Sequence, residues 1–293
     1  MTASSPPYRL FVGIDIAAKT CAVSWMSASS SPSRAITIEQ TPRGFAELLQ
    51  RLRSLEPEVE TILVVMEATG TYWMRLATFL VDAKIAVSVI NPVQAHDFAK
   101  ALLKRSKTDA IDAQTLAELG ARLQPARWSP PPMVYTELHQ RLVHRDALIR
   151  ARTQFQNQLH ALLQQPVIVD SVRSSLEELI AQLEEQIEEL AVEIAAALKQ
   201  DTAWAAAAAR LATVSGLGPI TTAWVLTTTL NFTLTATPEA AANYAGLAPH
   251  LRLSGTSVHG RPSIGQGGNA QLRRAMYMAT LSALRYNPVI RTF

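Results

Sequence analysis

Four acidic residues are placed where they could hold divalent metal ions. Asp15 lies at the end of the apolar run LFVGIDI, and Glu67 lies at the end of a second apolar run, TILVVME. Asp109 and Asp112 are three residues apart in KTDAIDAQTLAEL, so on a helix they share one face. Burying an acid at the end of a strand costs free energy unless a cation offsets its desolvation. Because clustered carboxylates with two hard cations cut phosphodiesters, these residues predict a metal-dependent nuclease-type site.

Each of these acids, taken singly, also has an ordinary structural explanation. Asp15 could be a turn residue, and Glu67 could be a surface acid that follows a strand. Asp109 or Thr108 could be the N-cap of the helix that contains Asp112. The metal site is favoured because every acid falls at an element where one nuclease fold requires it.

The first third of the sequence alternates between strand and helix patterns in the manner of an α/β domain. Alternating or continuous apolar runs predict strands, and apolar residues at helical spacing predict helices. The expected order is strands at 8–16, 20–26 and 33–40, a helix at 41–55, a strand at 60–68, a helix at 71–83, a strand at 85–92, and helices at 94–103 and 109–123. Three antiparallel strands followed by alternating helix and strand are the order expected of an RNase H-like sheet.

Two further regions are predicted beyond this domain, which we assign to residues 1–124. The proline-rich stretch PARWSPPPM ends the domain, and residues 125–205 form a helical region that includes a long basic helix, Tyr135 to Leu163. Apolar residues at heptad spacing between Ser174 and Leu198 predict a coiled-coil seam. This seam forms either within one chain, against the preceding helix, or between subunits. The alternative is a plain antiparallel helical hairpin within one chain. Residues 206–293 form a mainly α-helical C-terminal domain.

The C-terminal region combines glycine-rich turns with basic residues. Gly216, Gly218 and Pro219 form either a plain tight turn or a helix-hairpin-helix-like turn, in which backbone N–H groups hold a phosphate. After Glu239 the sequence has no Asp or Glu, whereas six arginines follow, which suits a polyanionic partner. These arginines are Arg252, Arg261, Arg273, Arg274, Arg285 and Arg291.

Composition narrows the class of protein. Apolar residues make up 48% of the 293 residues, which is typical of a globular chain, and the formal net charge is +3. The single cysteine, Cys21, excludes an internal disulfide framework and favours a reducing cytoplasm. MTASSPPYRL lacks the apolar core of a secretory signal, and no uncharged apolar stretch is long enough to span a bilayer. We therefore expect a cytoplasmic protein without membrane contact.

The motifs GIDIAAKT, EATGTYW and INPVQAHDFAKALLKRSKTDAIDAQTLAEL resemble the DEDD transposases of bacterial insertion sequences, relatives of the Piv-type DNA invertases. The motifs YAGLAP, SGTSVHGRPSIGQGGNAQLRRAMYMA and ALRYNPV resemble the second, transposase-specific domain of the same family. The resemblance covers nearly the whole chain and implies a RuvC-like catalytic domain with a metal-binding quartet at Asp15, Glu67, Asp109 and Asp112. The implied cofactor is Mg²⁺, as two ions, with Mn²⁺ as the alternative. Family members usually continue through a further basic helical stretch, whereas this sequence ends at Phe293.

The resemblance also implies a serine nucleophile. It places this serine in the C-terminal Ser-Gly motif, at Ser254, with Ser257 as the second choice. Serine is a poor nucleophile at its free pKa, and metal ions that bridge the scissile phosphate would supply the activation. The implied product is a transient phosphoserine link to DNA, formed at a composite site of a homo-oligomer, a dimer or a tetramer. Without the resemblance, Ser254 and the glycine that follows it are explained as a turn.

Nine basic residues are expected to contact nucleic acid, and they fall into three groups. The first group precedes the helix of Asp109 and would hold the strand against the metal ions. The second lies in the C-terminal block, with no acid nearby, and would clamp phosphates. The third lies on the long basic helix, whose own acids are few, and would follow a nucleic-acid backbone. In this order, the groups are Lys104, Arg105 and Lys107; Arg252, Arg261, Arg273 and Arg274; and Arg141 and Arg145.

The sequence with its resemblance predicts a DNA transposase or recombinase, associated with the bacterial nucleoid, that cuts and rejoins the strands of an insertion sequence. The family further implies a structured guide RNA as partner, so that base pairing reads the target while the protein reads backbone and shape. One alternative is a hydrolytic, Holliday-junction-type nuclease that uses the same acids with water as nucleophile. Another is a nucleic-acid-binding remnant that has lost catalysis.

Overall fold

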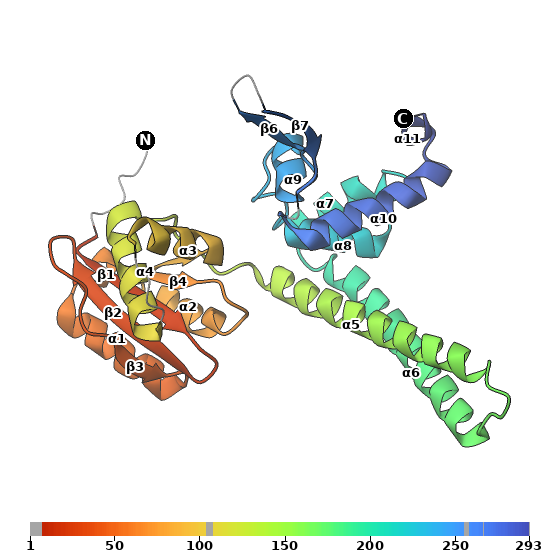
Figure 1. Cartoon of the computed structure of the whole chain (residues 1–293), viewed down its shortest axis with the longest axis horizontal. Coiled ribbons are helices and arrows are strands. Elements are labelled where there is room, and N and C mark those ends of the chain that lie inside the picture. Colours follow the sequence, from red (N-terminus) through yellow and green to blue (C-terminus); the bar gives the residue numbers. More distant parts are fainter. Residues whose placement is uncertain (1–7, 104–107, 255–257, 266, 293) are drawn as a thin grey trace. The chain divides into compact units, whose positions relative to one another are not determined.

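The computed structural model describes residues 8–103, 108–254, 258–265 and 267–292 (Figure 1). The chain divides into two compact units, with the division between Pro130 and Pro131. Residues 125–130 belong to the first unit because they run beside its edge strand: the Trp128 N–H donates to the Val87 carbonyl at 2.7 Å, and the Ser88 hydroxyl donates to the Pro125 carbonyl at 2.8 Å. The predicted helical region and C-terminal domain, 125–205 and 206–293, share the second unit from Pro131 onward.

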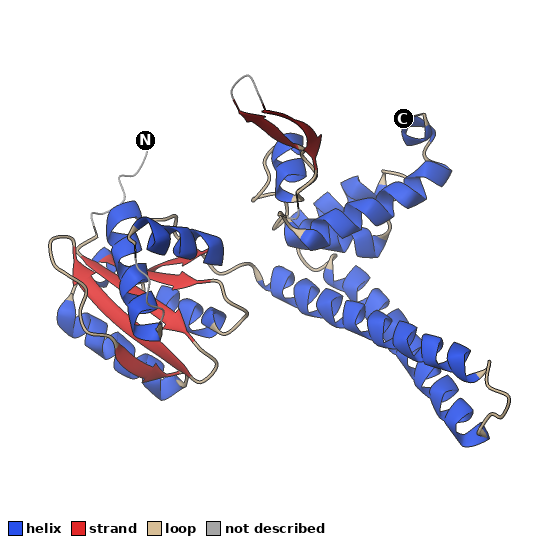
Figure 2. Ribbon diagram, in the orientation of Figure 1, coloured by secondary structure: helices blue, strands red, loops and turns tan. Residues whose placement is uncertain are grey.

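The first unit is built on a five-stranded mixed sheet with the strand order β3-β2-β1-β4-β5 (Figure 2). The strand β1 pairs antiparallel with β2, which pairs antiparallel with β3, whereas β4 and β5 continue the sheet in parallel. The strands are β1 (Leu10–Ile16), β2 (Thr20–Ser27), β3 (Ile36–Glu39), β4 (Ile62–Glu67) and β5 (Ala86–Ile90). The mixed sheet, and the order of its strands and helices along the chain, agree with the RNase H-like sheet predicted from the sequence.

Helices cover both faces of this sheet, and alternate residues of each strand decide which face is which. Even-numbered residues of β1 and β4, such as Val12 and Val64, pack in one cluster with α1 (Pro42–Leu55) and α2 (Trp73–Asp82). Odd-numbered residues, such as Phe11 and Val65, pack in a second cluster with α3 (Pro92–Ala101) and α4 (Asp109–Leu123). A short 3₁₀ helix, η1 (Val59–Thr61), leads into β4.

The helix α4 lies unusually close to β1 because β1 carries a glycine at the crossing. A Cβ atom at Gly13 would overlap the Ala113 carbonyl and the Ala117 backbone nitrogen, and would lie 2.8 Å from the Leu116 Cβ. In α4 itself, Gly120 faces the Val65 side chain in the same way. Two glycines therefore set the distance between helix and sheet.

The second unit begins with two long helices, α5 (Met133–Leu162) and α6 (Asp170–Ala197), which run antiparallel and pack on one another (Figure 1). The two helices form an antiparallel hairpin within one chain, whereas the coiled-coil seam stays a prediction. Leu142 and Ile194 are buried where the hairpin meets the rest of the unit, whereas Leu176 and Ile180 nearer the α5–α6 turn are only half-buried.

The rest of the second unit packs against the base of this hairpin. Its core contains Trp204, Ala223 and Trp224 together with Leu138 and further residues of α5 and α6. The elements are α7 (Thr202–Ala212), α8 (Pro219–Thr228), α9 (Pro238–Tyr244), β6 (His250–Ser254), β7 (Val258–Ser263), α10 (Ala270–Tyr286) and α11 (Pro288–Arg291). The segment expected as a glycine- and serine-rich loop is thus a two-stranded antiparallel hairpin, β6–β7. None of the described helices has the length and apolar character needed to cross a membrane.

The turn between α7 and α8 is set by its contact with α10. Gly216 has a φ of +107°, and a Cβ there would lie 2.8 Å from the Ala283 Cβ and 2.9 Å from the Ala279 carbonyl oxygen. Gly218 precedes Pro219, the first residue of α8, and a Cβ at Gly218 would meet nothing within 4 Å. The close approach to α10 therefore accounts for Gly216 as a packing turn.

Gly13→Val should destabilise the first unit by about 2 kcal/mol or more, because the added side chain has no space between β1 and α4. The measurement is the urea midpoint of unfolding at an unchanged m-value. Ala18→Val, on the exposed turn that follows β1, is the control, and we expect it to change stability by no more than about 0.5 kcal/mol. Equal effects of the two substitutions would contradict the proposed packing constraint.

Candidate metal centre

The first two acids of the quartet end neighbouring parallel strands. The register between β1 and β4 pairs Ile14 with Met66, so Asp15 and Glu67 are the next residues along at the same edge of the sheet. Both belong to the odd-numbered set, which faces α4. Sheet register alone therefore brings the two carboxylates to one place.

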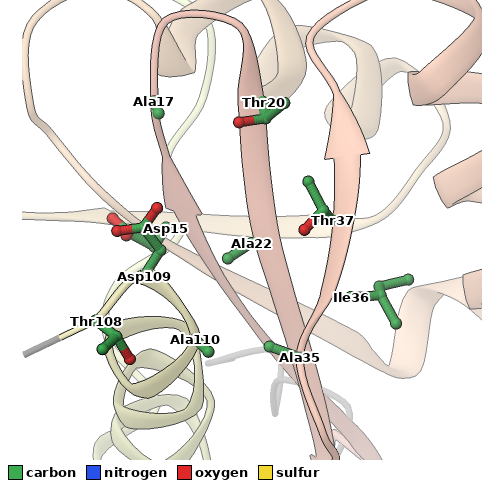
Figure 3. A pocket seen from close by; sticks show the side chains of 10 residues that line it. All are labelled: Asp15, Ala17, Thr20, Ala22, Ala35, Ile36, Thr37, Thr108, Asp109 and Ala110. Carbon is green, nitrogen blue, oxygen red and sulfur yellow. The ribbon is translucent and has the colours of Figure 1, made fainter.

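The other two acids come from the first turn of α4. Thr108 is the N-cap, and its hydroxyl accepts a hydrogen bond from the Ile111 N–H at 3.3 Å. Because Thr108 caps the helix, the Asp109 carboxylate is not needed for capping and can face the site. Figure 3 shows the side chains of Asp15 and Asp109 together at one end of a pocket. The contact at Gly13 holds the helix near enough for this meeting.

The half-buried carboxyl of Asp15 is subject to the charges of the other three acids. Burial and then the charges of Asp112, Asp109 and Glu67 raise the pKa of Asp15 from 3.8 to about 6. The Ile16 N–H opposes this shift by hydrogen bonding. All three predicted partners thus act on one half-buried carboxyl, and like charges so placed favour either a proton or a cation.

A neighbouring hydroxyl orients Glu67. The Thr69 hydroxyl donates to the Glu67 Oε1 at 2.6 Å, which leaves the other carboxylate oxygen to face elsewhere. Among the residues that the structure describes, no three acidic, histidine or cysteine side chains already have metal-coordinating geometry. The donor set is nevertheless the right one, since hard carboxylate oxygens are the ligands that Mg²⁺ and Mn²⁺ take.

A pocket of about 480 Å³ begins at Asp15 and Asp109 and extends over the sheet (Figure 3). The strand register places Asp15, Ala22 and Thr37 side by side on β1, β2 and β3. The remaining lining residues are Ala17, Thr20, Ala35, Ile36, Thr108 and Ala110. Most of these residues are alanine or threonine, so short side chains form the floor of the pocket, and hydroxyl groups lie on the same surface as the acids.

Sequence reasoning did not single out the floor of this pocket. A signal was present, since Thr20 and Ala22 alternate with core residues along β2 and lie opposite the strand of Asp15. The strand register is needed to show that these small residues lie beside Asp15.

For several of the predicted site residues the structure describes no side chain. Lys104, Arg105, Lys107 and Ser257 lie outside the described residues. For Ser254, Arg252 and Arg261 only the backbone is described: Ser254 is the last residue of β6, and the two arginines lie on the facing strands β6 and β7. Their roles therefore stay predictions.

The expectation that no acid lies near Arg274 is wrong. Arg274 Nη1 lies 2.7 Å from Asp146 Oδ2, and Asp146 is buried on α5. Arg273 Nη1 donates to the carbonyls of Ala245 and Gly267. Sequence separation hid these contacts, because the partners lie on other elements.

The long basic helix has few acids of its own, but acids of α6 add partners for its arginines. Arg141 Nε lies 2.9 Å from Glu193 Oε2 on α6, and Arg152 lies 3.7 Å from Glu184 of the same helix. Burial lowers the pKa of the neighbouring Arg145 from its ordinary value. The acids of α6 face the arginines of α5 across the hairpin, so Arg141 has a structural role within the unit.

Comparison with known proteins identifies the family. A DEDD-type model described as "Transposase" matches residues 12–168, and a model described as "Transposase IS116/IS110/IS902 family" matches residues 208–293. The pilin gene-inverting protein of Moraxella bovis is 32% identical over 274 residues, which cover 92% of this chain and 81% of that protein. The chain belongs to the IS110 family of transposases.

Other relatives agree with this assignment. The pilin gene-inverting protein of Moraxella lacunata is 31% identical over the same 274 residues. An uncharacterized 43.6 kDa protein of the insertion element IS110 from Streptomyces coelicolor is 40% identical over 83 residues, which are 28% of this chain and 20% of that protein. The chain is accordingly a DNA-cleaving and rejoining enzyme of the transposase and DNA invertase class.

Asp15→Asn should stabilise the metal-free protein at neutral pH. The pKa of folded Asp15, about 6, lies above its ordinary value of 3.8, so the folded state holds the proton more tightly and parent stability falls as pH rises between these values. The shift would correspond to about 3 kcal/mol for a buried group, and for this half-buried one we expect about 1 kcal/mol. Urea unfolding in EDTA should show this gain above about pH 6 and little difference below about pH 4.

The exposed Glu60 offers a control for this measurement, since Glu60→Gln should change stability by no more than about 0.5 kcal/mol at either pH. A loss of stability in Asp15→Asn at pH 7 would contradict the electrostatic account.

Proposed function

We propose that this protein is a Mg²⁺-dependent recombinase of an insertion sequence, in which Asp15, Glu67, Asp109 and Asp112 hold two divalent ions and Ser254 attacks the scissile phosphate. The observation that carries the proposal is the convergence of three acids on Asp15 at the mouth of a pocket. Such a site is costly for the metal-free protein, and cations of the Mg²⁺ or Mn²⁺ type offset that cost. When bound, they would polarise the phosphate and stabilise the leaving oxygen.

The protein's own groups prepare this site in three ways. Asp15, whose pKa is raised to about 6, would give up its proton to solvent at neutral pH and act as a carboxylate ligand. The Thr69 hydroxyl fixes the orientation of Glu67. Thr108 caps α4, so that Asp109 and Asp112 in its first turn are not needed for capping.

The pocket beside the acids would receive the DNA next to the scissile phosphate. Its volume is within the range of pockets that bind small ligands, and its alanine floor leaves room for a sugar and base. Thr20 and Thr37 present hydroxyls that can donate to sugar or phosphate oxygens. The acids would then lie at one end of a track for a single strand.

The serine step would proceed as a transesterification. Ser254 Oγ loses its proton and bonds to phosphorus, while the bond from phosphorus to one strand oxygen breaks and that oxygen takes up a proton. Attack by the hydroxyl of another strand on the phosphoserine then restores Ser254 and joins the new pair of strands. The proposal requires acids and serine to act on one phosphate, supplied by one chain or by subunits of a dimer or tetramer.

Nucleic acid is the proposed partner for the basic end of the chain. Arg252 and Arg261 lie on the paired strands next to Ser254, where phosphate contacts would hold the cut strand. We include a guide RNA in the proposal, with base pairing as the source of target choice. A cytoplasmic, nucleoid-associated location follows from this function.

Trapping of a covalent protein–DNA adduct tests the serine. With Mg²⁺ and an element-end DNA with its guide RNA, the parent should form an adduct that resists denaturation, while Ser254→Ala and Asp109→Asn should form none. Ser263→Ala is the matched control, because Ser263 is an exposed serine on the neighbouring strand, and it should retain the adduct.

Other outcomes would redirect the proposal. An adduct that persists in Ser254→Ala and is lost in Ser257→Ala would move the nucleophile to the second choice. Cleavage without any adduct, unaffected by Ser254→Ala, would instead support the hydrolytic nuclease.

Ala22→Leu tests the strand track, because a longer side chain would fill the floor between Asp15 and Thr37. We expect single-turnover cleavage to slow by about tenfold or more, which corresponds to ~1.4 kcal/mol of transition-state stabilisation. Mn²⁺ affinity, measured by calorimetry, should stay within about threefold, since the ligands are untouched. Ala18→Leu, on an exposed turn, is the control and should cleave normally. Unimpaired cleavage by Ala22→Leu would exclude this track.

A further inference from the structure

The β6–β7 hairpin that carries Ser254 lies in the long connection between α9 and α10, and the two ends of this connection lie close together. The connection begins after Ala245, at the end of α9, and ends at Gly267, shortly before α10. Arg273 Nη1 lies 2.9 Å from the Ala245 carbonyl oxygen and 2.8 Å from the Gly267 carbonyl oxygen. Since this nitrogen has two hydrogens, it can donate to both ends at once.

At this junction the two backbone segments approach so closely that only glycine fits between them. Gly246 and Gly268 have φ values of +70° and +86°, and a Cβ at either would overlap the other strand of the junction. The Asn269 N–H donates to the Tyr244 carbonyl at 2.6 Å, just beside the arginine contacts. We call this junction, residues 244–246 with 267–269, the hairpin base.

The hairpin base is anchored to the helical core by α10. Asn269 caps α10 by accepting from the Leu272 N–H at 2.9 Å, and Leu272 packs in a buried cluster with Ala245 and Val225. The adjacent Arg274 forms an ion pair with the buried Asp146 on α5. Arg273 therefore links α10 to the hairpin base, and Arg274 links α10 to the long helix α5.

An isolated two-stranded hairpin is only marginally stable, so its position depends on how its ends are held. At the base the holding group is a charged donor to two neutral carbonyls, which is stronger than an ordinary hydrogen bond. We propose that Arg273 is a positioning residue for Ser254, acting through the hairpin base and not through contact with DNA. This inference rests on the proposed function, in which Ser254 is the nucleophile.

The experiment compares Arg273→Ala with Gly246→Ala in the full-length protein. Gly246→Ala opens the same base from the backbone side, because its Cβ would overlap the Gly267 carbonyl and would lie 2.6 Å from Arg273 Nη1, while the arginine itself is retained. Arg210→Ala is the matched control: Arg210 is exposed on α7, and its Nε donates to the Ala206 carbonyl of its own helix.

The first readout is amide hydrogen exchange without DNA. Both base variants should raise the exchange rates of Gly246 and Asn269 by about tenfold or more, with the amides of α8 unchanged, as expected of a local opening. Arg210→Ala should exchange like the parent. Unchanged exchange at the base in Arg273→Ala would overturn the proposal, and this readout needs no catalytic activity.

The second readout separates positioning from DNA contact. At saturating element-end DNA with Mg²⁺, both base variants should form the Ser254 adduct about tenfold more slowly or worse, while the DNA dissociation constant stays within about twofold and its salt dependence is unchanged. Millimolar guanidinium should restore part of the rate in Arg273→Ala alone, since it replaces the missing donor.

Contrary results have distinct meanings. Weaker DNA binding in Arg273→Ala, with the salt slope reduced by about one, would make Arg273 a phosphate contact and overturn the positioning role. A normal adduct rate in Gly246→Ala despite an open base would also overturn it. If the parent itself forms no serine adduct, the proposed function fails, whereas the exchange result still decides whether Arg273 closes the base.

Discussion

The contact between β1 and α4 is the constraint on which the candidate metal centre depends. Gly13 has no side chain, so the first turn of α4 approaches the end of β1 and sets Asp109 and Asp112 against Asp15. Parallel register between β1 and β4 adds Glu67. The sheet and the helix are each held by ordinary apolar packing, and together they force four negative groups into one place.

The clustered acids lower the stability of the metal-free fold at neutral pH. The raised pKa of Asp15 is the mark of a carboxylate that the metal-free fold would prefer to keep neutral. Apolar clusters on both faces of the sheet supply the stability that tolerates it. In the function that we propose, cations would offset the repulsion between these carboxylates, and the pocket beside them would take a nucleic-acid strand.

In the second unit, several basic residues form ion pairs within the protein, and this changes the roles that we assign to them. Arginines that look free in the sequence form contacts with acids and carbonyls on distant elements: Arg141 with Glu193, and Arg274 with Asp146. Net positive charge in a segment therefore does not by itself show which side chains face a polyanion. Among the basic residues that remain as proposed DNA contacts, Arg252 lies on the strand that ends at Ser254, and Arg261 lies on the strand paired with it.

The sequence alone determined the elements of the first unit and the identity of the four acids, because apolar periodicity and strand-end acids are local signals. It did not determine the β6–β7 hairpin, since strands this short, with histidine, arginine and serine among their few residues, carry no core pattern. Only tertiary structure decided which acids meet, which floor lies beside them, and what Arg273 and Arg274 bind. The reason is that these contacts join residues far apart in the chain, and the register of a sheet or the closeness of a helix is fixed by packing across elements.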